Sequence, residues 1–319
     1  MEVNVSKKAP RKSPEPTMPP FDRRAMEKTM ADVGRLLAER DFDSLDEINA
    51  YINDTLAAGG PITHTGPQTP LEKAQDLMYQ AWEATGKRRV QLARKALQVS
   101  PDCADCYVLL AEEEAGSLEE ARDLYAQGVR AGERAIGPGA FKEWQGEFWG
   151  VLETRPYMRA RAGLAQTLWL LGERRQAIEH VQEMLRLNPD DNQGLRYVLM
   201  GWLLQMGDDR ALGELLRHYK DDYTAEALYT TTLWLFRQEG STPKSRRALK
   251  KALGENKAVP LYLLGRKRIP RELPEYVTWG GESEAAAYAA GALDAWRQTE
   301  GALTWLAEQV GEAPGRKKE

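Results

Sequence analysis

Apolar residues recur every three or four positions through most of the chain, and this helical spacing is clearest in residues 157–191. Two amphipathic segments lie there, separated by Gly172, whose permissive backbone suits the end of a helix. Pro189 ends the second segment, because proline cannot continue a helix. The pattern predicts two helices joined by a tight turn, with these residues facing inward: Leu164, Leu168, Leu171, Ala177, Ile178, Val181, Leu185 and Leu187.

Small residues mark the same stretch at fixed separations. Ala165, Gly172 and Ala177 precede the terminal Pro189, and this pattern resembles the tetratricopeptide repeat, a helix-turn-helix unit of about 34 residues. Each such unit leaves an apolar face that only its neighbour can bury. The resemblance therefore implies an all-α, tetratricopeptide-like α-solenoid of about six helical hairpins, with an additional N-terminal helical hairpin. No stretch alternates with period two long enough to predict a strand.

Composition along the chain suggests five parts. A basic, proline-rich start and a charged end have too little apolar content to recover the entropy of ordering, and a Gly/Pro/Thr-rich stretch separates the first hairpin from the array. The expected boundaries are a disordered tail at 1–20, the N-terminal hairpin at 21–58, a linker at 59–70, the repeat array at 71–311 with insertions at about 137–154 and 260–282, and a charged tail at 312–319.

The overall charge is close to balanced. With 319 residues and 42% hydrophobic content, the chain can bury a sizeable core. Its net charge is only -4, so its surface is not dominated by charges of one sign. No apolar run approaches the 18 or so residues of a membrane-spanning helix, and no secretory leader is evident. The expectation is a cytoplasmic protein that does not associate with membranes.

Three further stretches are more specific than the repeat pattern. They are CADCYVLLAEEEAGSLEEARDLYAQGVRAGE at 103–133, VPLYLL at 259–264 and GESEAAAYAAGALDAWRQTEGALTWL at 281–306. In this order they resemble the suppressor of tumorigenicity seven family, over about residues 93–306. The resemblance implies an interaction or regulatory role without established catalytic residues. Family members resemble membrane-anchored proteins at the N-terminus, where this chain has a hydrophilic tail, so the resemblance implies no membrane here.

Few residues suit catalysis or metal binding. Cys103 and Cys106 form a single CxxC at a helix start, where the helix dipole would lower the pKa of the first thiol. A zinc site needs a second pair, and a redox motif needs a βαβ setting, so two ordinary thiols are favoured. His64 lies in the predicted linker, and His180 and His218 fall on second helices of different repeats. We expect no enzyme activity, no cofactor and no metal.

Three consecutive carboxylates stand between apolar residues in one predicted helix. Three successive residues of a helix span roughly 200 degrees around its axis. At least one of the three carboxylates is therefore expected to point at a neighbouring helix, where it would need a cation. The arginines at the start of the next regular repeat are the natural partners. The predicted structural ion network consists of Glu112, Glu113, Glu114, Arg155 and Arg159, and a charged pocket for a partner's tail is the alternative.

The first helix of each repeat lines the concave surface in folds of this type, and its inward residues predict a peptide-binding groove. That groove contains Arg159, Gln166, Trp169, Arg196, Met200, Thr230, Trp234 and Arg237. Arginine forks pair with carboxylates and tryptophan contributes contact area. The predicted function is therefore a non-enzymatic scaffold or adaptor that binds an extended acidic and apolar peptide of a protein partner.

The strongest local imbalance of charge is in residues 240–275, which carry ten cationic side chains and three acidic ones. Such clusters can bind phosphate backbones, so a nucleic-acid-associated accessory role is the alternative function. The sequence leaves open the partner's identity, the oligomeric state, the biological process and whether the N-terminal hairpin docks on the array.

Overall fold

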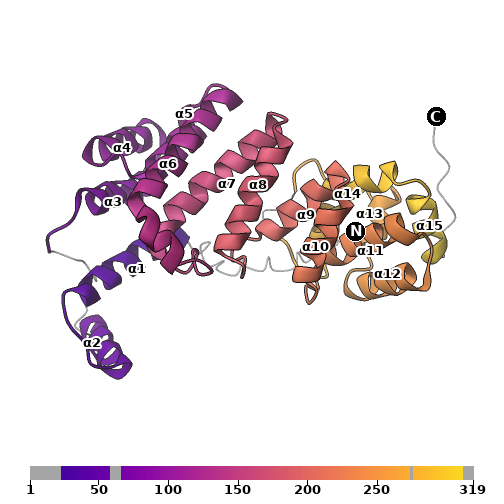
Figure 1. Ribbon diagram of the computed structural model, residues 1–319, viewed down its shortest axis with the longest axis horizontal. Coiled ribbons are helices and arrows are strands. Elements are labelled where there is room, and N and C mark those ends of the chain that lie inside the picture. Colours follow the sequence, from indigo (N-terminus) through magenta and orange to yellow (C-terminus); the bar gives the residue numbers. More distant parts are fainter. Residues whose placement is uncertain (1–22, 58–65, 274–275, 312–319) are drawn as a thin grey trace, which may run out of the picture. The chain divides into compact units, whose positions relative to one another are not determined.

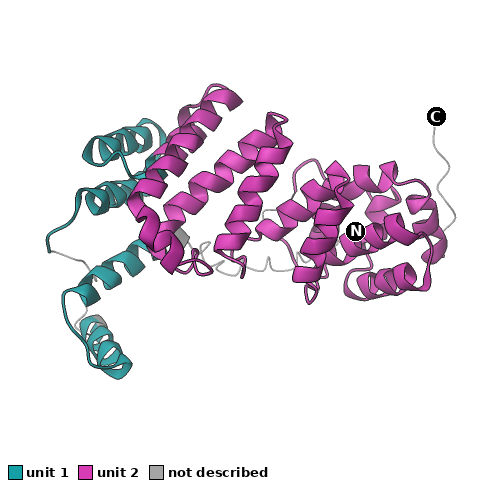
Figure 2. Cartoon of the chain, in the orientation of Figure 1, with its two compact units in different colours: residues 1–106 teal, residues 107–319 magenta. Residues whose placement is uncertain are grey.

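All the regular structure in the described residues is helical, as the hydrophobic pattern predicts. The protein is represented by a computed structural model that describes residues 23–57, 66–273 and 276–311 (Figure 1). The predicted tails at 1–20 and 312–319, and most of the linker at 59–70, lie outside these residues. The chain divides into two compact units, residues 1–106 and 107–319 (Figure 2). Each unit is described by itself.

Unit 1 contains the first four helices. They are α1 (Arg23–Ala38), α2 (Leu45–Ala57), α3 (Pro70–Glu83) and α4 (Gly86–Val99), and α5 (Ala104–Glu114) follows across the unit boundary. Thr69 starts α3 with a capping box, in which its hydroxyl accepts from the Glu72 N–H and the Glu72 carboxylate accepts from the Thr69 N–H. Helices α3 and α4 pack through residues that are completely buried: Ala74, Met78, Ala81, Ala93 and Ala96.

Helix α1 docks on α3 through charge. Both terminal nitrogens of Arg35 donate to the carboxylate of Asp76, at 2.8 and 3.2 Å. Burial alone would raise the pKa of Asp76, but the bonds from Arg35 and Gln68 outweigh it and lower that pKa. Part of the N-terminal hairpin therefore does dock, through a bidentate ion pair.

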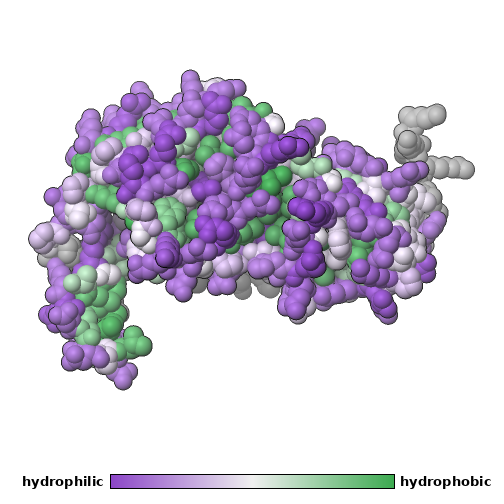
Figure 3. Space-filling view, viewed as in Figure 1, coloured by the Kyte–Doolittle hydropathy of each residue, from purple (hydrophilic) through white to green (hydrophobic). Residues whose placement is uncertain are grey.

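Apolar side chains gather on the visible surface of α2 (Figure 3), where Leu45 is largely exposed.

Unit 2 is a succession of helices that pack on their sequence neighbours. It contains α6 (Leu118–Glu143), the 3-10 helix η1 (Leu152–Thr154), α7 (Arg155–Leu170), α8 (Arg174–Leu187), α9 (Leu195–Met206), α10 (Asp209–His218), α11 (Ala225–Glu239), α12 (Pro243–Glu255), α13 (Val259–Leu263), α14 (Glu282–Gln298) and α15 (Ala302–Gln309). The inward positions predicted for 157–191 are mostly correct, since Leu164, Leu168, Ala177, Val181, Leu185 and Leu187 are buried.

Helices α6 and α7 approach each other closely because glycine stands at the contact. A Cβ at Gly132 would lie 2.7 Å from the Cβ of Tyr157 and 3.0 Å from its Cα. Gly163 on α7 faces the ring of Tyr125 on α6 in the same way. Helix α6 continues through part of the predicted insertion at 137–154, with a kink at Gly137, where φ is 73°.

The last hairpin does not simply extend the row. Helix α14 packs against α9 and α11 as well as α13 and α15, so the chain folds back on itself after residues 264–281. The buried face of α14 is rich in alanine, with Ala285, Ala286, Ala289, Ala292 and Ala295, and it also carries Glu284, Tyr288 and Trp296. None of the described helices combines the length and apolar character needed to cross a membrane.

Candidate functional site

The groove predicted from the first helices is not an open surface. Met200 and Thr230 are 0% exposed, so their assignment to a peptide-binding groove is wrong. The physical reason is that α14 packs against α9 and α11, the helices that carry these residues. Arg237 on α11 belongs to the same contact, because its Nε donates to the Thr299 hydroxyl at 2.8 Å and its Nη2 to the Ala295 carbonyl at 3.4 Å.

The other predicted groove residues differ in their exposure and in their contacts. Trp169 is half-buried and stacks on Trp202. Trp234 donates its indole N–H to the Asp209 carbonyl at 2.8 Å. Gln166 is exposed and Arg159 is half-buried. Arg196, discussed below, lines a pocket.

The predicted acidic network is more exposed than expected. Glu112, Glu113 and Glu114 are all exposed, so the expectation that at least one is buried is wrong. These three carboxylates occupy the last turn of α5, where the helix ends. Arg155 donates its Nε to the Trp149 carbonyl at 2.9 Å. Pairing between the carboxylates and Arg155 or Arg159 remains a prediction.

The two cysteines lie next to each other at the start of α5, and His180 lies on a different helix, α8. Cys103 and Cys106 are buried free thiols, and the hydrogen bond between them together with burial raises the pKa of Cys106. His180 is half-buried on α8, where burial and Arg161 lower its pKa to about 4. His64 lies outside the described residues. Within them, no three His, Cys, Asp or Glu side chains are grouped so that they could hold a metal ion.

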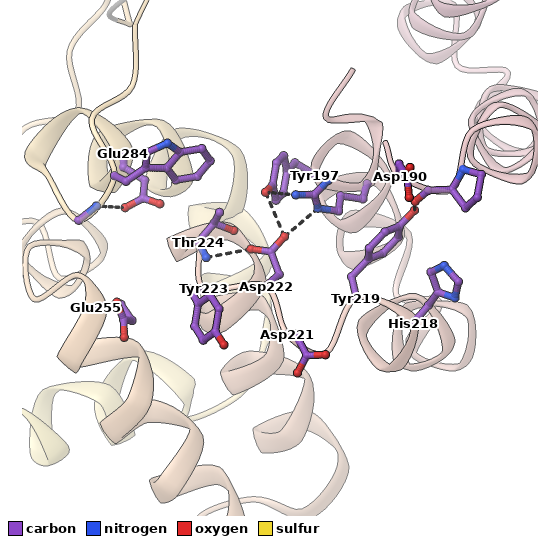
Figure 4. Close-up of a pocket in the computed structure, with 14 residues that line it drawn as sticks. Asp190, Tyr197, His218, Tyr219, Asp221, Asp222, Tyr223, Thr224, Glu255 and Glu284 are labelled. Atoms are coloured by element: carbon purple, nitrogen blue, oxygen red, sulfur yellow. Dashed lines mark hydrogen bonds and ion pairs between the residues drawn. The ribbon is translucent and has the colours of Figure 1, made fainter. Parts of the chain in front are cut away.

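A large acidic pocket lies at the ends of the helices of unit 2. We call it the acidic pocket, and its volume is about 860 Å³ (Figure 4). It is built from the α8–α9 turn, the start of α9, the α10–α11 turn, the end of α12 and the start of α14. Its charged lining comprises one guanidinium and five carboxylates, namely Arg196, Asp190, Asp221, Asp222, Glu255 and Glu284, and His218 also lines it.

Arg196 holds one wall of the acidic pocket together. Its Nε donates to Asp222 at 2.7 Å and its Nη1 to Asp191 at 3.0 Å. The guanidinium also lies over the rings of Tyr197 and Tyr219, 4.3 and 5.3 Å from their centroids. All these partners belong to the chain itself. Arg196 is therefore already neutralised, and it is not available to pair with a partner's carboxylate as the sequence suggested.

The carboxylates that Arg196 contacts are held by backbone groups as well. Burial alone would raise the pKa of Asp222, but bonds from the Thr224 N–H, Arg196 and Tyr197 prevail and lower it. Asp191 accepts from the N–H groups of Leu195 and Arg196 at the start of α9, yet burial dominates and raises its pKa. Asp222 thus remains ionised, and it lies centrally in the pocket (Figure 4).

Glu284 ties three elements together at the opposite wall. Its carboxylate accepts from the N–H of Ala225 at 2.9 Å, from the side-chain amide of Asn256 at 2.9 Å and from the N–H of Gly280 at 2.8 Å. These groups belong to α11, to the residue that follows α12 and to the approach to α14. One buried carboxylate therefore fixes the position of the chain segment that carries the pocket's outer residues.

Three other carboxylates of the acidic pocket are not used internally. Asp190, Asp221 and Glu255 are exposed, and no described residue forms a hydrogen bond or ion pair with their side chains. Two aromatic side chains stand beside them, Tyr223 at 62% and Trp279 at 66% exposed. Carboxylates and aromatic faces together favour a cation. Tyr223 already has one, because Lys251 Nζ lies 5.1 Å from its ring centroid.

Sequence reasoning missed this site because many of its residues lie in turns. The repeat pattern predicts only which side of each helix faces inward. A signal was present in the paired acidic residues after α8 and after α10, Asp190 with Asp191 and Asp221 with Asp222. Helices of similar length that pack antiparallel bring alternate turns to one end. What could not be foreseen is that the chain after α13 returns to complete the pocket with Trp279 and Glu284.

Comparison with known proteins gives consistent matches. The sequence model of the ST7 protein family matches residues 63–145. The chain is 31% identical over 259 residues to the "Suppressor of tumorigenicity 7 protein-like" of Rattus norvegicus, covering 74% of this chain and 46% of that protein. The human protein of that name is 30% identical over 263 residues, covering 74% and 45%.

A more distant relative is "Protein ST7 homolog" of Drosophila melanogaster, which is 28% identical over 257 residues, covering 72% of this chain and 47% of that protein. The chain spans about half the length of the curated relatives it matches.

Proposed function

This chain belongs to the suppressor of tumorigenicity 7 family, and from that premise we propose that it is a non-enzymatic scaffold that captures a cationic segment of a protein partner in the acidic pocket. The observation that carries the proposal is a group of three carboxylates with which no described residue pairs, Asp190, Asp221 and Glu255, beside the exposed indole ring of Trp279. A lysine or arginine side chain satisfies both kinds of group at once.

The proposed scaffold is a tetratricopeptide-like α-solenoid of about six helical hairpins. Support comes from the pairwise packing of consecutive helices, in which α3 with α4, α7 with α8 and α11 with α12 form closely packed hairpins. Repeat folds of this kind carry binding sites on surfaces that several repeats build together. The acidic pocket has that property, since residues from α9, α12 and α14 line it.

The occupant proposed for this pocket differs in charge from the acidic and apolar peptide that the sequence suggested. That expectation rested on Arg196 and Arg237 as free guanidinium groups, and both are engaged within the chain. An acidic peptide would bring further carboxylates to a pocket that already holds an excess of them, which is unfavourable.

Panning a random peptide library on the immobilised protein tests the proposal. We expect enrichment of peptides with lysine or arginine, and loss of this class when the bait carries Asp221→Asn and Glu255→Gln. A bait with Glu179→Gln and Glu300→Gln, two exposed glutamates outside the pocket, is the matched control and should retain the class. The proposal fails if no cationic class appears, or if that class survives the pocket substitutions.

A second candidate function is association with nucleic acid, and the surface of α12 favours it. Its five cationic residues are all exposed: Lys244, Arg246, Arg247, Lys250 and Lys251. A phosphate backbone would be bound with a strong dependence on salt. Charge reversal at Arg247 and Lys250 should abolish such binding and leave capture of cationic peptides unchanged.

A further inference from the structure

Unit 2 has a second pocket whose charge is opposite to that of the acidic pocket. We call it the basic pocket, and its volume is about 730 Å³. It lies where the chain leaves α13, and its other walls come from α14 and α15. The two pockets have no lining residue in common.

The charged rim of the basic pocket is entirely cationic. Arg266, Lys267, Arg268 and Arg297 line it, and its lining includes no carboxylate. Lys267 is paired with Glu282, and Arg297 contacts Asp294 at 3.4 Å one turn earlier on α14, with 61% of its side chain still exposed. Surface ion pairs of this kind contribute little energy. A ligand's anionic group can therefore reach Arg268 and Arg297 without breaking a strong internal bond.

The floor of the basic pocket is aliphatic. Leu264, Ile269, Leu293 and Leu303 are half-buried and pack against the core of unit 2 while they line the cavity. An inorganic anion would leave this surface uncovered. A rigid nucleic-acid duplex would touch the rim and not the floor. The chemistry fits a flexible ligand that presents an anionic group and an aliphatic group close together.

We propose that the basic pocket binds an acidic peptide segment of a protein partner, with a carboxylate at Arg268 and Arg297 and an aliphatic side chain on the leucine and isoleucine floor. The arginine fork pairs with a carboxylate in two parallel hydrogen bonds, which fixes the orientation of the segment. This site is additional to the acidic pocket, so the scaffold holds two segments of opposite charge. The two proposals are independent, so one pocket can fail to bind a peptide while the other still binds its own.

The probe for this proposal is a fluorescein-labelled peptide in which two glutamates flank a leucine and an isoleucine. Two counterparts replace the glutamates with glutamine or the aliphatic residues with serine. A labelled twelve-residue oligo-dT is the nucleic-acid arm. The full chain is compared with an Arg268→Glu, Arg297→Glu variant and with an Arg247→Glu, Lys250→Glu control, which reverses two exposed cations on α12 outside the pocket.

We expect the acidic probe to bind the full chain, and its Kd to rise at least tenfold in the Arg268→Glu, Arg297→Glu variant and less than twofold in the α12 control. The glutamine and serine counterparts should each bind at least fivefold more weakly. Circular dichroism checks that both variants fold. The proposal is overturned by absence of binding, by equal losses in both variants, or by oligo-dT that displaces the peptide and binds more tightly.

Discussion

The indole rings of Trp169 and Trp202 stack face to face, with centroids 4.5 Å apart and planes within 2° of parallel. The two residues come from α7 and α9, so this contact connects successive hairpins. Replacing Trp169 with alanine removes the stack and a large apolar area from the joint. We expect Trp169→Ala to lower the free energy of unfolding by about 2–4 kcal/mol, measured by urea denaturation.

The matched control is Trp279→Ala, because Trp279 is 66% exposed at the rim of the acidic pocket. This change should alter stability by less than about 0.5 kcal/mol. It should weaken binding of a cationic peptide, whereas Trp169→Ala should not. An equal loss of stability in the two variants would show that the stack does not hold the hairpins together.

Arg196 should be needed for stability, and this follows from the burial of its partners. The Asp191 and Asp222 side chains are 1% and 6% exposed, and Arg196 compensates both. Arg196→Ala would leave two buried carboxylates without their cation, a loss of about 3–5 kcal/mol in the free energy of unfolding. Arg196→Lys should recover only part, because ammonium cannot reproduce the forked contacts. Unchanged stability would mean that Arg196 is free for a partner after all.

The sequence predicted the helices of this protein better than their tertiary arrangement. Leu164, Leu168, Val181 and Leu185 are buried, as their spacing indicated. Apolar residues at helical spacing lie on one face of the helix, and that face packs against the neighbouring helix. Gly172 ends its helix with a positive φ of 84°, as its position suggested. These features depend on residues within one hairpin.

The features that sequence reasoning missed depend on distant segments. Nothing near Met200 or Thr230 indicates that α14 returns to pack on α9 and α11, so these residues were assigned to a surface that the chain itself covers. The alanine-rich face of α14 indicated burial but not its partner. The acidic pocket was missed for the same reason, since Asp222 and Glu284 meet only after this return.

Glu226, on the first turn of α11, should make stability depend on pH. Burial, followed by the nearby carboxylates of Glu284 and Asp222, raises its pKa to about 8 from an ordinary value of 4.5. The folded chain therefore binds a proton that the unfolded chain releases between these two values. The contribution of Glu226 to stability falls as pH rises from about 4.5 to about 8, and it is constant above that.

Glu226→Gln should remove this dependence. We expect the variant to gain stability relative to the wild-type chain between pH 5 and pH 8, with no further gain at pH 9, in urea denaturation at each pH. Glu179→Gln, an exposed change on α8, controls for the loss of one carboxylate. A difference between Glu226→Gln and wild type that does not vary with pH would contradict the raised pKa.

Because α6 and α7 approach each other closely, adding one methyl group at Gly132 should lower the stability of the protein. Gly132→Ala places a Cβ against the backbone of Tyr157, which side-chain rotation cannot relieve. We expect a loss of about 1–3 kcal/mol in thermal or urea denaturation. Gly254→Ala on α12 is the control, since no atom lies within 4 Å of its new Cβ, and alanine there should stabilise by about 0.5–1 kcal/mol. Losses of similar size at both positions would refute the packing argument.

The central claim is that the acidic pocket recognises positive charge, and a thermodynamic cycle tests it most directly. Titration calorimetry would measure the Kd of an arginine-containing peptide and of its citrulline counterpart, which has nearly the same shape but no charge. Both are titrated into the wild-type chain and the Asp221→Asn, Glu255→Gln variant. We predict at least tenfold tighter binding of the arginine peptide to wild type, about 1.4 kcal/mol, shrinking to less than threefold in the variant. Equal binding of the two peptides to the wild-type chain, or a preference for arginine that persists undiminished in the variant, would contradict the claim.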